Sequence, residues 1–219
     1  MEIMNDRDEN RERYFHETEL KMIVRGWAEE NACPQTLDAL AMAERCHAGQ
    51  LRKVMGKERV PFIRHPLILA AHAIRLGIAD DTLAAACLLH DVCEDCGIRN
   101  SELPVGPQAR EIVRLLTKEQ GVDYRLEEND RPYFAGIAEN PDACMVKILD
   151  RCNNMSEMSS AFSTHRMKEY LEETERFVIP LFAVAEKKEK YRSALFLVKY
   201  HMMSVLEAQK RMFREIAHE

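Results

Sequence analysis

The stretch LAAACLLHD, residues 83–91, constrains the fold more than any other part of this sequence. Apolar residues fill it up to its histidine and aspartate, and an acidic pair at 80–81 stands where a helix cap is expected. A helix that is apolar on every side is stable only when other elements surround it. The stretch therefore predicts a buried helix that runs from residues 80–81 to Gly97, with His90 and Asp91 at the edge of the core.

Helical periodicity continues over most of the chain. Clear strand alternation is absent from the 219 residues. The residues 51–62 could hold a short hairpin around Gly56. The polar, acidic segment 119–131 is predicted to be a mobile loop, with one more short helix as the alternative. Further helices are predicted over about 36–49, 66–77, 106–118, 131–140, 141–158, 165–190 and 192–216. The predicted fold class is an all-α helical bundle with at most one short hairpin near 51–62.

No change in composition marks a domain boundary. We expect an N-terminal helical segment over 1–34, a main domain over 35–190, and a C-terminal helix over 191–219 packed on the same domain. A chain of this length buries a substantial core without disulfides. The sequence does not decide whether the protein forms a homo-oligomer, in which the last helix could be a dimerisation element.

Composition limits the partners and the compartment. The net charge of −6 argues against nucleic acid as the main partner but allows a small anionic ligand. No segment approaches the length of a membrane span, and the charged first residues predict no signal peptide. The seven scattered cysteines do not form a disulfide framework. We therefore expect a cytoplasmic protein that binds neither membranes nor nucleic acid.

Four residues from three places in the sequence suggest a metal site. Burying His90 and Asp91 is unfavourable unless they are paired or bind a metal. His65 begins another predicted helix, and Asp150 follows the apolar residues of VKILD at 146–150. Two imidazoles and two carboxylates suit a divalent ion such as Mn²⁺ or Fe²⁺, and suit Zn²⁺ or Mg²⁺ less well.

Two further acids follow the predicted metal ligands by one helical turn. Residues four apart share a helix face, so His90 pairs with Glu94, and Asp91 with Asp95. A bound divalent ion lowers the pKa of water and polarises a phosphoryl oxygen. Glu94 and Asp95 would then orient the attacking water or accept its proton.

Cys93 and Cys96 form a C-x-x-C motif within the same stretch. A redox pair usually lies at a helix N-terminus, whereas these cysteines fall near the predicted end of an apolar helix. A zinc site needs a second ligand pair, which the sequence lacks. We therefore expect both cysteines to pack as small, partly buried residues.

Over about 36–182 the sequence resembles the HD-domain metal-dependent phosphohydrolases. More narrowly, it resembles the hydrolase domain of RelA/SpoT-type (p)ppGpp enzymes and the stand-alone small alarmone hydrolases of the stringent response. The segments that carry the resemblance are HAGQLRK, PFIRHPL, DDTLAAACLLHDVCEDC, VRLLTK, VKILDRCNNM and EETERFVIPL. The resemblance implies that 35–190 is an HD-type hydrolase domain with an all-α fold.

The resemblance also implies roles for individual residues. His65, His90, Asp91 and Asp150 would bind one Mn²⁺. Glu94 and Asp95 would activate the water that cleaves the 3′-pyrophosphate of ppGpp, which gives GDP and pyrophosphate. Arg52 and Lys53 match a basic pair beside the nucleotide, and Asn154 matches a residue that faces the ribose and base.

Other substrate contacts depend on the residues alone. Lys147 either extends from a buried helix to solvent or reaches a phosphate, and we favour the phosphate. Lys118 is equally a helix-end charge or a site residue. In NNMSEMS, residues 153–159, Ser156 and Glu157 stand where the family has Arg and Thr. This departure puts the base of the substrate in doubt more than the metal or the reaction.

Two alternative functions stay open. An HD-type nucleotidase or phosphatase would use the same metal site on another nucleotide. A non-catalytic alarmone-binding module would lack a ligand or an acid, and this sequence lacks neither.

Overall fold

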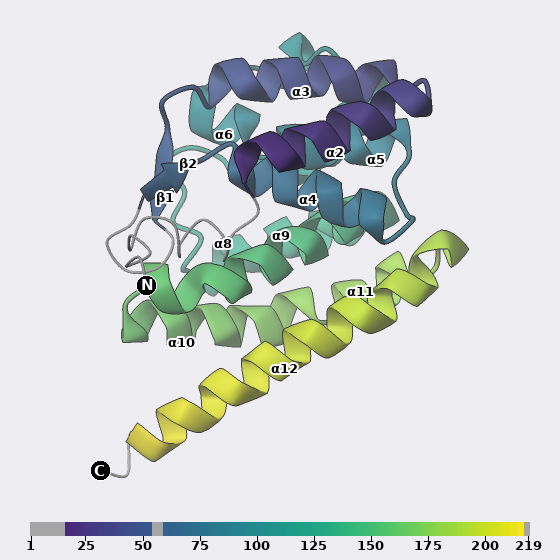
Figure 1. Cartoon of the computed structure of the whole chain (residues 1–219). Helices are drawn as coiled ribbons and strands as arrows, with labels where there is room; N and C mark the ends of the chain where they lie inside the picture. The colour runs from purple at the N-terminus through teal and green to yellow at the C-terminus, as the bar shows by residue number, and fades with distance from the viewer. Residues whose placement is uncertain (1–15, 54–58, 217–219) are drawn as a thin grey trace, which may run out of the picture.

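The computed structural model describes residues 16–53 and 59–216 of the chain. In these ranges it is an all-α bundle with one two-stranded hairpin, which confirms the predicted fold class (Figure 1). The N-terminal part of the predicted segment 1–34, residues 1–15, lies outside the described ranges. The helices and strands are α2 (Glu17–Glu30), α3 (Pro34–Cys46), β1 (Leu51–Lys53), β2 (Arg59–Pro61), α4 (Arg64–Arg75), α5 (Asp81–Leu89), α6 (Val92–Cys96), α7 (Pro107–Leu116), α8 (Glu127–Ile137), α9 (Pro141–Ala161), α10 (Thr164–Glu173), α11 (Leu181–Ala185) and α12 (Arg192–Ile216).

The core forms around α5, as the apolar stretch predicts. Every residue from Leu83 to Leu89 is buried, and α3, α4, α7 and α9 pack against this helix. Asp80 caps α5, because its side chain accepts a hydrogen bond from the Leu83 N–H. Asp81 ties α5 to α3 through two 2.8 Å hydrogen bonds, from the amide and the hydroxyl of Thr36.

The predicted single helix from residues 80–81 to Gly97 is wrong, because the helix is interrupted at His90 and Asp91. The Nδ1 atom of His90 lies 2.9 Å from the Cys87 carbonyl oxygen, which a continuing helix would pair with the Asp91 N–H. The imidazole thus competes with the helical hydrogen bond at this point. As a result, His90 and Asp91 lie in the turn that follows α5, whereas Glu94 and Asp95 belong to α6.

Two other predicted elements differ from the structure. The second part of the predicted loop 119–131 is helical, since α8 begins at Glu127. The predicted helix 165–190 is not continuous: α10 leads into a π-helical turn at Thr174–Val178, and the chain turns at Pro180 before α11. Proline has no N–H to donate and disrupts a helix interior, which explains this interruption.

The hairpin and α9 bring distant residues together. β1 and β2 pair antiparallel, with Arg52 opposite Val60. The long helix α9 contacts α4, α5, α7, α8, α11 and α12, so residues along it face several parts of the bundle. Arg151 on α9 is buried, and it donates hydrogen bonds to Thr174 Oγ1 at 3.0 Å and to the Tyr170 carbonyl at 3.2 Å.

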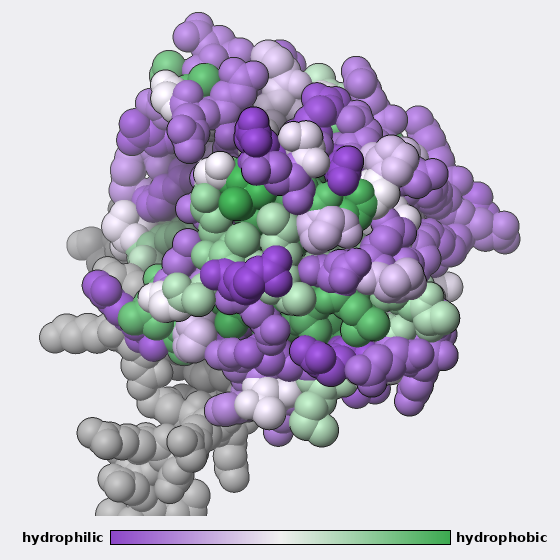
Figure 2. Space-filling model, turned by 90° about the horizontal axis from the view of Figure 1, so that it is seen from above, coloured by the Kyte–Doolittle hydropathy of each residue, from purple (hydrophilic) through white to green (hydrophobic). Residues whose placement is uncertain are grey.

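Figure 2 shows one face on which hydrophilic residues predominate and apolar residues gather in smaller areas near the middle. In the described ranges, no helix combines the length and the apolar composition that a membrane crossing requires. The helix α12 lies along the side of the bundle farthest from α2 and α3 (Figure 1).

Candidate active site

Four predicted ligands from separate parts of the sequence come together. The Nε2 atoms of His65 and His90 lie 3.2 Å apart. The Oδ2 atom of Asp91 lies 3.5 Å from His65 Nε2 and 3.1 Å from His90 Nε2. The Oδ1 atom of Asp150 lies 3.2 Å and 4.0 Å from the same two nitrogens. Metal–ligand bonds of about 2.1 Å place neighbouring ligand atoms about 3 Å apart, and the donor atoms of His65, His90 and Asp91 lie close enough together to hold one divalent ion, with Asp150 beside them.

Each imidazole is held from its other side. The Nδ1 atom of His65 lies 2.7 Å from the Asn153 Oδ1 atom, and that of His90 contacts the Cys87 carbonyl. Both acceptors require a hydrogen on Nδ1, so Nε2 is the nitrogen of each ring that faces the carboxylates and can bind a metal once it loses its proton. This arrangement is typical of histidines that bind metals.

The local charges favour a cation at the cluster. Burial disfavours the charged form of His90, but the Asp91 and Asp150 carboxylates outweigh it and raise its pKa to about 9. Burial opposes ionisation of Asp91, yet the adjacent imidazoles lower its pKa to about 2. The cluster therefore stabilises positive charge between two ionised carboxylates, which a divalent ion would supply.

Glu94 and Asp95 lie beside the cluster and line the same cavity, which has a volume of about 320 Å³. Burial and the neighbouring Asp91 and Glu94 carboxylates raise the pKa of Asp95 to about 6. A carboxyl group with this pKa can exchange a proton near neutral pH. Glu94 is fixed differently, since its Oε2 atom accepts the Lys118 backbone N–H at 3.0 Å.

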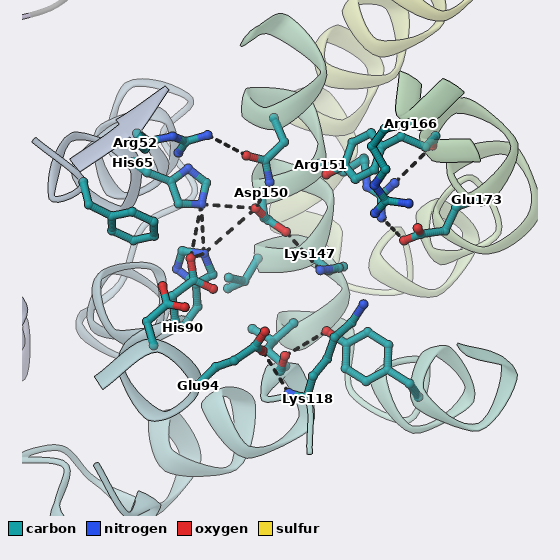
Figure 3. Close-up of a pocket in the computed structure, with 18 residues that line it drawn as sticks. Arg52, His65, His90, Glu94, Lys118, Lys147, Asp150, Arg151, Arg166 and Glu173 are labelled. Atoms are coloured by element: carbon teal, nitrogen blue, oxygen red, sulfur yellow. Dashed lines mark hydrogen bonds and ion pairs between the residues drawn. The ribbon is translucent and has the colours of Figure 1, made fainter. Parts of the chain in front are cut away.

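Cationic side chains line the opposite side of this cavity. Figure 3 shows His65 and His90 on one side, with Lys118 and Arg166 across from them. Lys147 lies between, and its Nζ atom donates to Asp150 Oδ2 at 3.0 Å. Burial, followed by the nearby Lys147, lowers the pKa of Lys118. A wall of this kind can neutralise an anionic group that extends from the cluster.

Sequence reasoning missed part of this wall. Arg166 was not predicted, and neither was Tyr133, whose ring lies 5.1 Å from Lys118 Nζ and 5.6 Å from Lys147 Nζ. For Lys118, the last residue of the VRLLTK segment, the sequence favours a site role no more than a charge at a helix end. Tyr133 and Arg166 carry no motif, and only the packing of α8 and α10 brings them to the cavity.

Arg52 and Asn154, both predicted to contact the substrate, also line this cavity and contact each other. Arg52 Nη2 donates to Asn154 Oδ1 at 2.9 Å, and Asn154 Nδ2 donates to Asp150 Oδ1 at 2.5 Å. Arg52 also lies 3.1 Å from Glu157 Oε2, where both side chains are largely buried. The backbone of Lys53 belongs to β1, whereas its side chain lies outside the part of the chain that the structure describes.

The two cysteines of the C-x-x-C motif are not activated. Burial raises the pKa of both Cys93 and Cys96, which disfavours the reactive thiolate. Cys96 Sγ instead lies 3.3 Å from the Cys46 carbonyl oxygen. Both cysteines belong to the short helix α6, so their predicted position near the end of a long apolar helix is wrong.

Comparisons with known proteins give the family of the chain. No family model matches the chain. The chain is 30% identical over 169 residues to the guanosine-3′,5′-bis(diphosphate) 3′-pyrophosphohydrolase MESH1 of Mus musculus, an alignment that covers 74% of this chain and 93% of that protein. MESH1 of Homo sapiens matches with the same identity and coverage. The enzyme named guanosine-3′,5′-bis(diphosphate) 3′-pyrophosphohydrolase in Aquifex aeolicus is 32% identical over 147 residues, which are 65% of this chain and 20% of that protein.

A solved structure supports the fold. The structure titled as a metazoan ortholog of SpoT that hydrolyses ppGpp matches with a TM-score of 0.54 and 20% identity, and the match covers 73% of this chain and 95% of that one. At this identity the likeness concerns the all-α fold alone. The sequence relationship to MESH1 carries the assignment: the chain belongs to the family of guanosine-3′,5′-bis(diphosphate) 3′-pyrophosphohydrolases.

Proposed function

We propose that this protein hydrolyses guanosine-3′,5′-bis(diphosphate) with water to GDP and pyrophosphate. The observation that carries the proposal is the convergence of four ligand atoms beside two acids in one cavity. The names of its relatives support the substrate. We place the protein in the cytoplasm, a compartment consistent with seven free cysteines.

His65, His90, Asp91 and Asp150 would hold the ion, for which we propose Mn²⁺ because of the mixed nitrogen and oxygen donors. When bound, such an ion supplies a lowered pKa for water and polarises a phosphoryl oxygen. Asn153 keeps the His65 ring in position, and Asn154 does the same for the Asp150 carboxylate.

The remaining residues would divide the work between proton transfer and binding. Asp95 has the raised pKa of a proton acceptor, and Glu94 is the second carboxylate at the attacking water. Lys118, Lys147 and Arg166 would bind the phosphate oxygens, while Arg52 and Asn154 would face the nucleoside. The cations also offset the charge that develops as the phosphate ester bond breaks.

A second substrate class is another nucleotide with the same metal chemistry. The Arg52–Glu157 ion pair favours this candidate, because it places a carboxylate where the family has a threonine. The partner in either case is a small nucleotide.

The test is incubation of the full chain with Mn²⁺ and ppGpp, with GDP and pyrophosphate measured by chromatography. We expect both products in equal amounts, and neither with Asp91→Asn. A panel of nucleoside mono-, di- and triphosphates runs beside it. If another nucleotide turns over and ppGpp does not, the second candidate is correct. Binding of ppGpp without turnover by the wild type would mean a non-catalytic module.

A further inference from the structure

A second cavity lies on a different face of α9, between α4, α9 and α12. Its volume is about 480 Å³, which is within the range of about 300–1,000 Å³ for small-molecule sites. The walls are largely aliphatic: Ile68 comes from α4, Leu76 directly follows that helix, and Leu197 and Val198 come from α12. None of these residues lines the candidate active site.

Positive and hydrogen-bonding groups line the same cavity. Arg75 is exposed beside it, and no ion pair within residues 16–53 and 59–216 involves this arginine. His72 from α4 and His201 from α12 also line it, and Ser156 Oγ lies 3.1 Å from His201 Nε2. An aliphatic interior with an unpaired guanidinium at its edge complements an organic anion with an apolar body.

Two residues that line this cavity also contact residues of the candidate active site. Asn153 lines the second cavity, yet its Oδ1 atom lies 2.7 Å from His65 Nδ1. Glu157 also lines it, and its Oε2 atom lies 3.1 Å from Arg52 Nη2. The exposed fractions of the Glu157 and Arg52 side chains are only 12% and 17%, so water screens this ion pair weakly. An occupant would therefore touch residues that orient a metal ligand and a substrate contact.

We propose that this cavity binds a small amphipathic anion, and that its occupant acts on the active site through Asn153 and Glu157. The occupant has one carboxylate, sulfonate or phosphate group near Arg75 and an apolar body among the aliphatic residues. By holding Glu157 in place, it orders Arg52 before substrate arrives, which lowers KM. The effect on KM rests on the proposed function, whereas the binding does not.

Binding is tested on the full chain with 8-anilinonaphthalene-1-sulfonate, an aromatic anion, and with decanoate, an aliphatic one. We expect saturable fluorescence at one site, displaced by decanoate. Leu197→Glu places a negative charge at the cavity and should weaken binding about tenfold. Phe196→Glu is the matched control, since Phe196 is exposed on the same helix, does not line the cavity, and should change the affinity less than about twofold. Arg75→Gln should weaken both ligands.

Several results would overturn the site. One is the absence of saturable binding, and another is an equal loss in the two glutamate variants. Displacement by pyrophosphate would place the probe in the active-site cavity. Sedimentation showing a dimer that Leu197→Glu dissociates, without probe binding, would assign the cavity to an interface between copies of the chain.

The coupling has its own readout. With decanoate at saturation, KM for ppGpp should fall about threefold in the wild type and in Phe196→Glu, but not in Leu197→Glu. An unchanged KM overturns the coupling. Absence of ppGpp hydrolysis together with intact probe binding would instead count against the proposed function alone.

Discussion

The Nδ1 atom of His65 lies 2.7 Å from the amide oxygen of Asn153, and both side chains are buried. The two residues belong to α4 and α9, so this hydrogen bond joins two core helices behind the candidate metal ligands. It fixes the tautomer and the direction of the His65 ring.

Asn153→Ala should weaken Mn²⁺ binding by about 10- to 100-fold, as loss of a group that orients a metal-binding histidine usually does. Asn153→Asp keeps an acceptor oxygen and should retain most of the affinity. Calorimetric titration of each variant with Mn²⁺ gives the comparison, with thermal melts to confirm folding. Equal affinity in the alanine variant and the wild type would contradict the role given to Asn153.

The raised pKa of Asp95 predicts an acid limit to the reaction. As a proton acceptor Asp95 must be ionised, so kcat should fall as pH drops through about 6, and a bound cation would move this limit only to lower pH. Asp95→Asn should lower kcat about a hundredfold or more while KM changes little. Rates between pH 5 and 8 provide the measurement. An acid limit well above pH 7, or unaltered kcat in Asp95→Asn, would exclude this role.

The position of Lys118 in the cavity predicts that its substitution changes KM more than kcat. Lys118→Met removes a cation from the wall opposite the ligands and should raise KM for ppGpp about tenfold, with a smaller effect on kcat. Lys187→Met is the control, since Lys187 is exposed and does not line the cavity. The affinity of the wild type should also decline as salt increases. Similar KM values in both variants would mean that phosphates bind elsewhere.

The raised pKa of Asp130 on α8 predicts that the stability of the folded protein changes with pH. Burial and the Glu173 carboxylate raise its pKa to about 6, and its Oδ1 atom has no hydrogen-bond partner among the described residues. Because this folded-state pKa exceeds the ordinary value, ionisation destabilises the folded protein increasingly as pH rises from about 4 through 6.

Asp130→Asn removes that charge. It should raise the melting temperature at pH 8 by roughly 2–4 °C, which corresponds to about 1 kcal/mol for a chain of this size, and have little effect near pH 4. Calorimetric melts at both pH values test this. Destabilisation at pH 8 would show that the carboxylate makes a favourable contact with the nearby Lys118.

The sequence predicted the features that depend on local residue type. The apolar run of α5 required burial, and His90 and Asp91 at its end had to be paired or to bind a ligand. The break at these residues was not predictable from periodicity, because it depends on a side chain that binds the Cys87 carbonyl.

Contacts between distant segments were harder to predict. Arg52 and Glu157 are separated by more than a hundred residues, and the hairpin and α9 had to be placed before their ion pair could be recognised. Arg166 reaches the cavity only through the position of α10. Such residues have no spacing pattern, so the cationic wall required the three-dimensional structure.

The four candidate ligands come from α4, from the junction of α5 and α6, and from α9, all parts of the core. A divalent ion held by all of them would act as a non-covalent crosslink between helices far apart in the chain. Local opening of any one helix would then require release of the ion. Resistance to proteolysis and slow amide exchange along α9 would consequently follow the metal content of the preparation.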